Sequence, residues 1–172
     1  MLFRSLGDAN KVEYRDLNSS ERFAALASGE VDLLSRNTTM TLSRDAAGGN
    51  GLSFAPTTFY DGQGVMTLAN SGVRSLKDLA GKPICVESGT TTELNLADRM
   101  RQLKVPYTPL KFQTGDQTYA AYLGGRCVAV TSDRSQLAAK RTSFPDPAQH
   151  VLLPDVLSKE PLTPATVNGD PA

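Results

Sequence analysis

The sequence predicts an α/β fold, built on a mostly parallel sheet with helices on both faces. Between residues 75 and 153, apolar runs of strand length alternate with segments of helical periodicity, an order typical of βαβ units. Three apolar runs, at residues 31–35, 83–86 and 127–132, each lead into a polar loop. Because ligands of open α/β sheets bind beyond the strand ends, these loops also indicate a binding site.

Composition and charge limit the classes of function. The 172 residues suffice for one large domain or two small ones, and 40% hydrophobic and 21% charged residues are ordinary values for a globular protein. Basic and acidic residues balance at 18 each, which disfavours nucleic acid or an anionic membrane as a partner. The sequence has neither a nucleotide-binding glycine motif nor the histidine and cysteine spacing of a zinc site. We therefore expect neither a cofactor nor a metal.

The first part of the chain predicts a strand, a helix and a second strand. Residues 12–17 alternate between apolar and polar side chains, as a half-buried strand does. Asn18 and Glu21 have the spacing of a capping box, and the helix that they begin ends at Gly29, before a strand at 31–35. The expected buried face of this helix consists of Phe23, Leu26 and Ala27.

A long extended segment separates two groups of elements. Residues 59–69 can run as one strand, although Gly62 and Gly64 interrupt them, and we interpret this strand as a crossing between two lobes. Residues 50–54, which precede it, are expected to be irregular. The second lobe is expected to contain helices at 75–80, 91–103, 117–123 and 135–141, and strands at 84–86, 108–112, 128–131 and 151–153.

Both ends of the chain look incomplete. Residues 1–5 lack the apolar core and cleavage site of a secretory signal, and a presumed helix end follows at Leu6 and Gly7. Residues 161–172 are rich in Pro, Gly and Thr and have no helical periodicity, so we expect them to be irregular. The pattern favours a fragment of a longer protein, with a flexible tail as the alternative.

Polar groups at the three strand ends suit a small zwitterion. Arg44 ends the first loop, and its planar guanidinium suits bidentate binding of a carboxylate. Thr90 and Thr91 begin a helix whose free amides attract an anion, and Asp133 could receive an α-ammonium group. Taken singly, solvation explains Arg44, and helix capping explains Thr90 and Asp133. Their occurrence at equivalent strand ends is what indicates recognition of an α-amino acid.

Two cysteines, Cys85 and Cys127, lie at the starts of two predicted strands. One interpretation is that they are two small buried hydrophobic side chains. The other applies if the strands adjoin in an oxidising compartment, where a disulfide would close a loop of about 43 residues.

Seven segments resemble the periplasmic solute-binding proteins of amino-acid ABC transporters, specifically the general L-amino-acid branch (family 3). They are LNSSERF (17–23), NTTMTLSRD (37–45), FAPTTFYDGQG (54–64), LKDLAGK (76–82), CVESGTTTE (85–93), DRSQL (133–137) and SKEPL (158–162). The segments follow in order between Gly7 and Gly169, which is far more specific than any single motif. The pattern departs at Met40, where a Trp is usual in this branch.

The resemblance implies a two-lobed α/β fold of the periplasmic-binding-protein type (type II), with lobe one truncated at both chain ends. Crossing strands join the lobes, and the amino acid is enclosed between them. The implied division assigns residues 6–64 to a partial lobe one and residues 65–157 to lobe two with the hinge crossings. Residues 158–172 are then a truncated return segment to lobe one.

The resemblance also implies roles for single residues. The implied ligand-binding residues are Arg44, Thr39, Asn37, Thr91, Thr90, Asp133 and Ser19. Arg44 would bind the ligand α-carboxylate with help from Thr39 and Thr91, and Asp133 would bind the α-ammonium group. Asn37 marks a segment of backbone contacts, and Ser19 faces the side-chain pocket.

The function implied is capture without catalysis: a periplasmic protein of a Gram-negative bacterium binds an L-amino acid and delivers it to a membrane permease. A monomer is expected. One alternative is an enzyme, because cyclohexadienyl and arogenate dehydratases share this fold. Such an enzyme needs a general acid in the cleft, and Glu87 is the nearest candidate. Another alternative is the amino-acid-sensing domain of a receptor.

Overall fold

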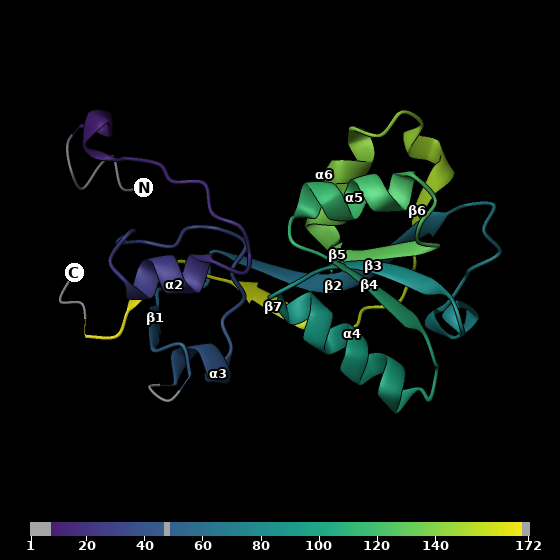
Figure 1. Ribbon diagram of the computed structural model, residues 1–172, viewed down its shortest axis with the longest axis horizontal. Helices are drawn as coiled ribbons and strands as arrows, with labels where there is room; N and C mark the ends of the chain where they lie inside the picture. Colours follow the sequence, from purple (N-terminus) through teal and green to yellow (C-terminus); the bar gives the residue numbers. More distant parts are fainter. Residues whose placement is uncertain (1–7, 47–48, 170–172) are drawn as a thin grey trace.

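A computed structural model describes residues 8–46 and 49–169, which form two lobes joined by two paired strands (Figure 1). We call the part built from α2, α3, β1 and β8 lobe one, and the part built around the large sheet lobe two. The segments at residues 1–5 and at Leu6 and Gly7, for which the sequence predicts no signal peptide and a helix end, lie outside the described residues.

Lobe two contains a mixed sheet with the strand order β4-β3-β5-β2-β6. The strands are β2 (Phe59–Leu68), β3 (Pro83–Glu87), β4 (Thr108–Phe112), β5 (Ala129–Asp133) and β6 (His150–Leu152). β3 is parallel to β4 and β5, as predicted, whereas β2 is antiparallel to β5 and β6. The prediction of a mostly parallel sheet is therefore wrong for β2. β2 enters the sheet directly from lobe one. As an antiparallel neighbour of β5 and β6, it does not need the crossover connection that a parallel neighbour requires.

Each face of this sheet supports its own apolar core, since successive strand residues point to opposite faces. Helix α4 (Thr91–Gln102) covers one face, and α5 (Gly115–Leu123) and α6 (Arg134–Thr142) cover the other (Figure 1). Buried residues on the α4 face include Val65, Ile84, Leu96, Met100 and Ala129. Buried residues on the other face include Met66, Cys85, Tyr122, Val130 and Leu137.

The helices of lobe two begin at polar side chains that cap them. The hydroxyl of Thr90 accepts a hydrogen bond from the Glu93 amide at 3.2 Å, and Thr114 accepts one from the Gln117 amide at 3.3 Å. Because Thr114 is the cap, α5 begins two residues before the predicted start at residue 117. Three short 3-10 helices complete the described helices: Ala9–Lys11, Leu76–Leu79 and Pro147–Gln149.

Lobe one is built from small elements. They are α2 (Arg22–Ala27), α3 (Leu42–Asp45), β1 (Leu52–Phe54) and β8 (Ala165–Val167). The predicted capping box precedes α2: the Glu21 amide donates to Asn18 Oδ1 at 3.0 Å, and the Asn18 amide donates to Glu21 Oε1 at 2.9 Å. The buried apolar cluster consists of Leu26, Leu34, Leu52 and Ala165. Ala27, predicted to be buried, is exposed.

Strand pairing in lobe one differs from the prediction. Residues 12–17 form no strand, and 31–35 contribute a single bridge between Leu34 and Ala165. By contrast, β1 and β8, which pair with each other, lie in segments predicted to be irregular. Alternation of side chains shows that a segment can form a strand, but a partner from a distant part of the chain decides whether it does.

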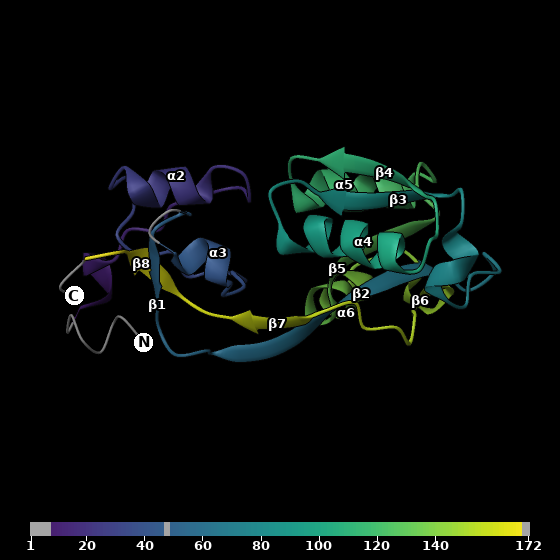
Figure 2. The ribbon, with the colours of Figure 1, turned by 90° about the horizontal axis from the view of Figure 1, so that it is seen from below.

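Two strands connect the lobes. The single strand predicted at residues 59–69 is confirmed as β2, and its first half pairs with β7 (Lys159–Leu162). Figure 2 shows β2 and β7 running side by side from one lobe to the other. The predicted boundary at residues 64–65 falls inside β2, and the boundary at 157–158 falls just before β7; both boundaries stay predictions.

A disulfide joins β3 to the start of the β5 segment. Cys85 and Cys127 are bonded, with 5.6 Å between their Cα atoms and a sequence separation of 42. This distance lies within the range that a disulfide requires. In the part of the chain that the structure describes, no helix has the length and apolar character needed to cross a membrane.

Candidate ligand-binding site

A polar cleft lies where the two lobes face each other. Its walls come from the loops and helix starts at the carboxyl ends of β3 and β5 and from the opposing loops of lobe one. The lining residues are Ser19, Arg22, Asn37, Thr39, Glu87, Thr90, Thr91, Thr92, Ser132, Asp133 and Gln136. Six of the seven residues predicted to bind ligand lie in this set, the exception being Arg44.

Asp133 ends β5 and supplies a buried carboxylate to the cleft, with 4% of the residue exposed. Its side chain makes no capping hydrogen bond to α6, so helix capping does not explain this residue. Asn37 of lobe one donates a hydrogen bond to Asp133 Oδ2 at 2.9 Å. Burial raises the pKa of Asp133 to about 6, against the effect of the Asn37 hydrogen bond, and the negative charges of Glu160 and Asp61 add to the rise.

The helix start at α4 places two threonines differently. Thr90 caps α4, and its hydroxyl also donates to the Glu87 carbonyl at 2.7 Å, so the capping explanation holds for Thr90. Thr91 is not used as a cap. Its hydroxyl lies 3.3 Å from the hydroxyl of Thr39 in lobe one and donates to Glu160 at 2.9 Å. Thr91 therefore contacts both the opposite lobe and the connecting strand β7.

Arg44 is buried in α3 with 8% of the residue exposed, so the solvated alternative is wrong. Its Nη1 donates to the Thr39 carbonyl at 2.7 Å, and its guanidinium lies 4.9 Å from the centre of the Phe23 ring. Among the described residues it forms no ion pair. Burial lowers the pKa of Arg44, while the charges of Glu160 and Asp133 act in the opposite direction. The net direction is downward because burial outweighs the charges of these two carboxylates.

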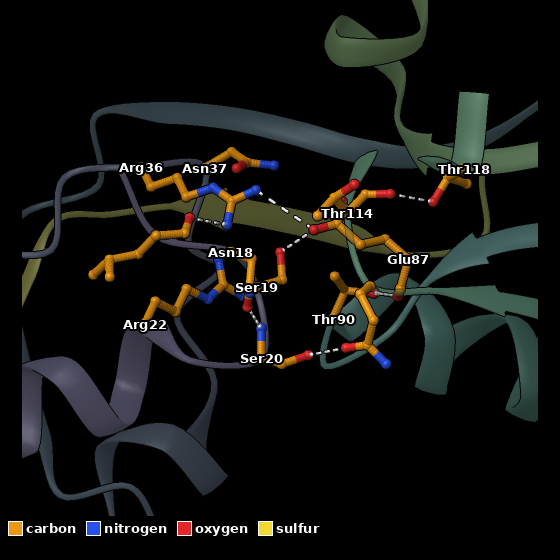
Figure 3. A network of polar contacts seen from close by, with 12 residues as sticks. Asn18, Ser19, Ser20, Arg22, Arg36, Asn37, Glu87, Thr90, Thr114 and Thr118 are labelled. Carbon is orange, nitrogen blue, oxygen red and sulfur yellow. Dashed lines mark hydrogen bonds and ion pairs between the residues drawn. The ribbon is translucent and has the colours of Figure 1, made fainter. Parts of the chain in front are cut away.

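Glu87 links the lobes directly (Figure 3). The Ser19 hydroxyl donates to Glu87 Oε1 at 2.5 Å, and an Arg36 guanidinium nitrogen lies 3.6 Å from the same oxygen. Gly89 brings the backbones together nearby: a Cβ atom at Gly89 would lie 3.2 Å from the Ser19 carbonyl oxygen and from the Ser20 Cα. With φ at +74°, Gly89 also has a conformation that other residues rarely adopt.

Glu160 in β7 connects both walls of the cleft to the hinge. It is 1% exposed and accepts hydrogen bonds from Thr39 at 2.5 Å, Thr91 at 2.9 Å and Asn95 at 2.8 Å, together with one from Ser158. The sequence prediction missed Glu160 as part of the site. Glu160 lies in one of the segments that carry the family resemblance, SKEPL (158–162), but the residues alone give no signal that this carboxylate is buried.

Arg22, also missed, lies on the buried side of α2 with 2% of the residue exposed. Its spacing from the buried Ala25 and Leu26 is i+3 and i+4, which puts all three on one face of the helix. A helical pattern that considers only apolar residues does not include Arg22. A pattern that also allows a charged residue on the buried face would have placed Arg22 beside Ala25 and Leu26.

The lobes in the structure lie close together. The cleft encloses a cavity of about 20 Å³, room for roughly one water molecule and far less than an amino acid needs. Entry of a ligand therefore requires the lobes to separate. Within residues 8–46 and 49–169, no group of three or more His, Cys, Asp or Glu side chains is placed to hold a metal ion.

Comparison with known proteins identifies relatives of this two-lobed arrangement, although no family model matches the chain. The chain is 49% identical over 164 residues to the general L-amino acid-binding periplasmic protein AapJ of Rhizobium johnstonii, a match that covers 95% of the chain and 48% of AapJ. It is 46% identical to the glutamate/glutamine/aspartate/asparagine-binding protein BztA of Rhodobacter capsulatus, with 96% and 48% covered. The predicted resemblance to periplasmic amino-acid-binding proteins is confirmed.

Solved structures agree with this resemblance. A periplasmic binding protein from Brucella ovis with glutathione bound superimposes with a TM-score of 0.88 at 48% identity, covering 95% of the chain and 51% of that structure. An ancestral arginine-binding protein bound to arginine gives a TM-score of 0.83 at 25% identity, with 98% and 71% covered. The predicted two-lobed α/β fold is thus confirmed. The chain spans about half the length of the curated relatives it matches.

Proposed function

We propose that this chain binds L-amino acids in the cleft between its lobes, as the solute-binding part of an ABC transporter in the periplasm. The observation that carries the proposal is a pair of buried groups of opposite charge, Asp133 in the lining of the cleft and Arg44 bonded to the carbonyl of the lining residue Thr39. Among the described residues, Arg44 forms no ion pair and the Asp133 side chain makes no capping hydrogen bond. An α-amino acid presents one carboxylate and one ammonium group, which complement these two residues.

The proposed residue roles follow from this complementarity. Arg44 binds the α-carboxylate, with the Thr39 and Thr91 hydroxyls beside it. Asp133 binds the α-ammonium group, and Asn37, which donates to Asp133 in the closed lobes, exchanges this contact for one with the ligand. Thr90 holds the start of α4 in place, and Ser19 contributes to the side-chain pocket.

Binding is proposed to couple to hinge closure. The cavity of the closed lobes is too small for an amino acid, so ligand enters while the lobes are apart. Closure then brings Asp133 and Thr91 of lobe two to a ligand held by lobe one. Delivery of the ligand to a membrane permease is part of the proposal, because a relative that is 49% identical over 164 residues, YhdW of Escherichia coli, is named a putative amino-acid ABC transporter-binding protein. We propose further that the protein acts as a monomer.

Calorimetry against the twenty amino acids tests the proposal. We expect binding of one or more L-amino acids with a stoichiometry of one, and D-enantiomers should bind far more weakly. Arg44→Gln should weaken every amino-acid ligand by roughly 30-fold or more, because it removes the charge-assisted contacts of a buried guanidinium. Unchanged affinity in a folded Arg44→Gln variant would remove Arg44 from the site.

We propose that the chain catalyses no reaction of its own. Glu87, the candidate general acid for a dehydratase, is occupied by Ser19 and Arg36 of the opposite lobe. Incubation with prephenate and arogenate should therefore leave both compounds intact. Formation of an aromatic product would contradict this part of the proposal.

A further inference from the structure

Arg22 is a buried cation in the lining of the cleft, and the proposed contacts to the α-carboxylate and the α-ammonium group of a ligand do not use it. It is 2% exposed, lines the cleft, and forms no ion pair among the described residues. Its Nε has no hydrogen-bond partner, and Nη1 makes a long contact of 3.4 Å to the Thr38 hydroxyl. An uncompensated buried charge is strongly destabilising, so a site that retains one gains from an anion supplied from outside.

The aromatic ring of Phe23 organises Arg22 together with Arg44. The guanidinium carbons lie 4.7 Å and 4.9 Å from the centre of this one ring. Cation–π contact offsets part of the cost of placing two cations together. Burial, and then the charges of Arg44 and Arg36, lowers the pKa of Arg22 to about 9, so the side chain remains a cation at neutral pH.

Glu87 and Asp133 are the carboxylates whose charges raise the pKa of Arg22, and each of them already has a hydrogen-bond partner. Glu87 is held by Ser19 and by Arg36, and Asp133 accepts from Asn37. Figure 3 shows the Arg22 side chain extending toward Ser19, with no contact drawn between Arg22 and Glu87. Arg22 is therefore available to a further anionic group that enters the cleft.

We propose that Arg22 makes the cleft selective for amino acids with a carboxylate on the side chain. This inference rests on the proposed function. The α-carboxylate and the α-ammonium group use Arg44 and Asp133, which leaves Arg22 as the counterion of a second carboxylate. A neutral amide of the same shape can accept a hydrogen bond there, but it does not neutralise the buried charge.

Isosteric ligand pairs test this selectivity. Titration calorimetry compares glutamate with glutamine, and aspartate with asparagine, on the wild-type chain and on Arg22→Gln, Arg22→Lys and Arg36→Gln. We expect the better acidic ligand to bind at least about 30-fold more tightly than its amide, the ratio that a buried charge pair typically produces. Arg22→Gln should reduce this ratio to about threefold or less and change the affinity for the amide little. Arg22→Lys, which keeps the charge, should retain part of the preference.

Arg36→Gln is the matched control, because Arg36 already pairs with Glu87 and acts on the site only through its more distant charge, so this variant should reduce the acid-to-amide ratio much less than Arg22→Gln does. Amide ligands binding as tightly as acidic ones to the wild type would overturn the inference while leaving the proposed function standing. So would an equal loss for both ligand classes in Arg22→Gln, since that outcome assigns Arg22 to the α-carboxylate or to structure alone. If Arg22→Gln does not fold, the wild-type ratio and Arg22→Lys decide. Absence of binding by every amino acid would overturn both proposals.

Discussion

The two lobes contribute unequally to the stability of the fold and to the buried positive charge near the cleft. Lobe two buries an extended apolar cluster on each face of its sheet and adds a disulfide. In the described part of lobe one, the buried apolar cluster is small, yet this lobe contributes the buried Arg22 and Arg44. We infer that lobe two is the more stable part, and that lobe one holds two buried cations whose cost the Phe23 ring offsets in part and a ligand would offset further.

Core truncation provides the sharpest contrast between the lobes. Met100→Ala removes a fully buried side chain from the α4 face and should lower the free energy of unfolding of lobe two by about 2–5 kcal/mol. Leu52 is equally buried, but it belongs to the small cluster of lobe one. Leu52→Ala should leave the main calorimetric transition of lobe two in place. Equal shifts of a single transition by both variants would contradict the unequal division.

The disulfide should matter for lobe two alone. Replacing Cys85 and Cys127 together by alanine releases a loop with a sequence separation of 42. The chain-entropy model gives about 3–4 kcal/mol for such a loop, and we expect a loss of this size in denaturant unfolding of lobe two. Hydrogen exchange of the α2 amides is the internal control and should not change. Faster exchange there would show that the lobes unfold as one unit.

Asp133 should show the cost of a buried charge at the cleft. Its pKa rises from 3.8 to about 6 on folding, so the folded state holds the proton longer than the unfolded state does. The stability contributed by this group is full below pH 3.8 and is lost as pH rises to about 6. Above that range, Asp133→Asn should raise the stability of the unliganded protein by up to about 3 kcal/mol. A variant that is less stable than the wild type at pH 8 would contradict this account.

Close approach of the lobes at Gly89 should control closure. Gly89→Ala combines a positive φ with a contact of 3.2 Å to the backbone of lobe one, so we expect it to disfavour the closed state by about 1–2 kcal/mol. Ligand affinity should fall accordingly in calorimetry. Gly81→Ala is the matched control: its φ is +70°, but nothing lies within 4 Å of its Cβ position. Equal losses of affinity in both variants would make backbone strain, not closure, the cause.

The sequence predicts lobe two better than lobe one for a physical reason. Helix α4 and strand β2 are long, strongly patterned segments, and their local signals agree with the fold. The pairing of β1 with β8 joins segments more than 100 residues apart, and neither segment has enough residues to show a period. The direction of β2 relative to β5 and β6 could not be predicted either, because it depends on how the chain connects the two lobes.

The candidate site shows a similar limit. Loop residues such as Asn37, Thr91 and Asp133 are predictable, because strand ends and family segments mark them. Glu160 is buried by contacts from both lobes, and Arg22 is buried in lobe one, where it contacts Thr38 and the Phe23 ring. Residue type alone predicts solvent exposure for both of them, and the tertiary structure overrides it.

Recognition of both ends of a zwitterion by opposite lobes can be tested with one comparison. The best amino-acid ligand and its analogue without the α-amino group are titrated into the wild type and into Asp133→Asn. We predict that the wild type binds the amino acid at least about 30-fold more tightly than the analogue, and that Asp133→Asn binds the two about equally. Retention of the full preference by a folded Asp133→Asn variant would show that lobe two does not bind the ammonium group.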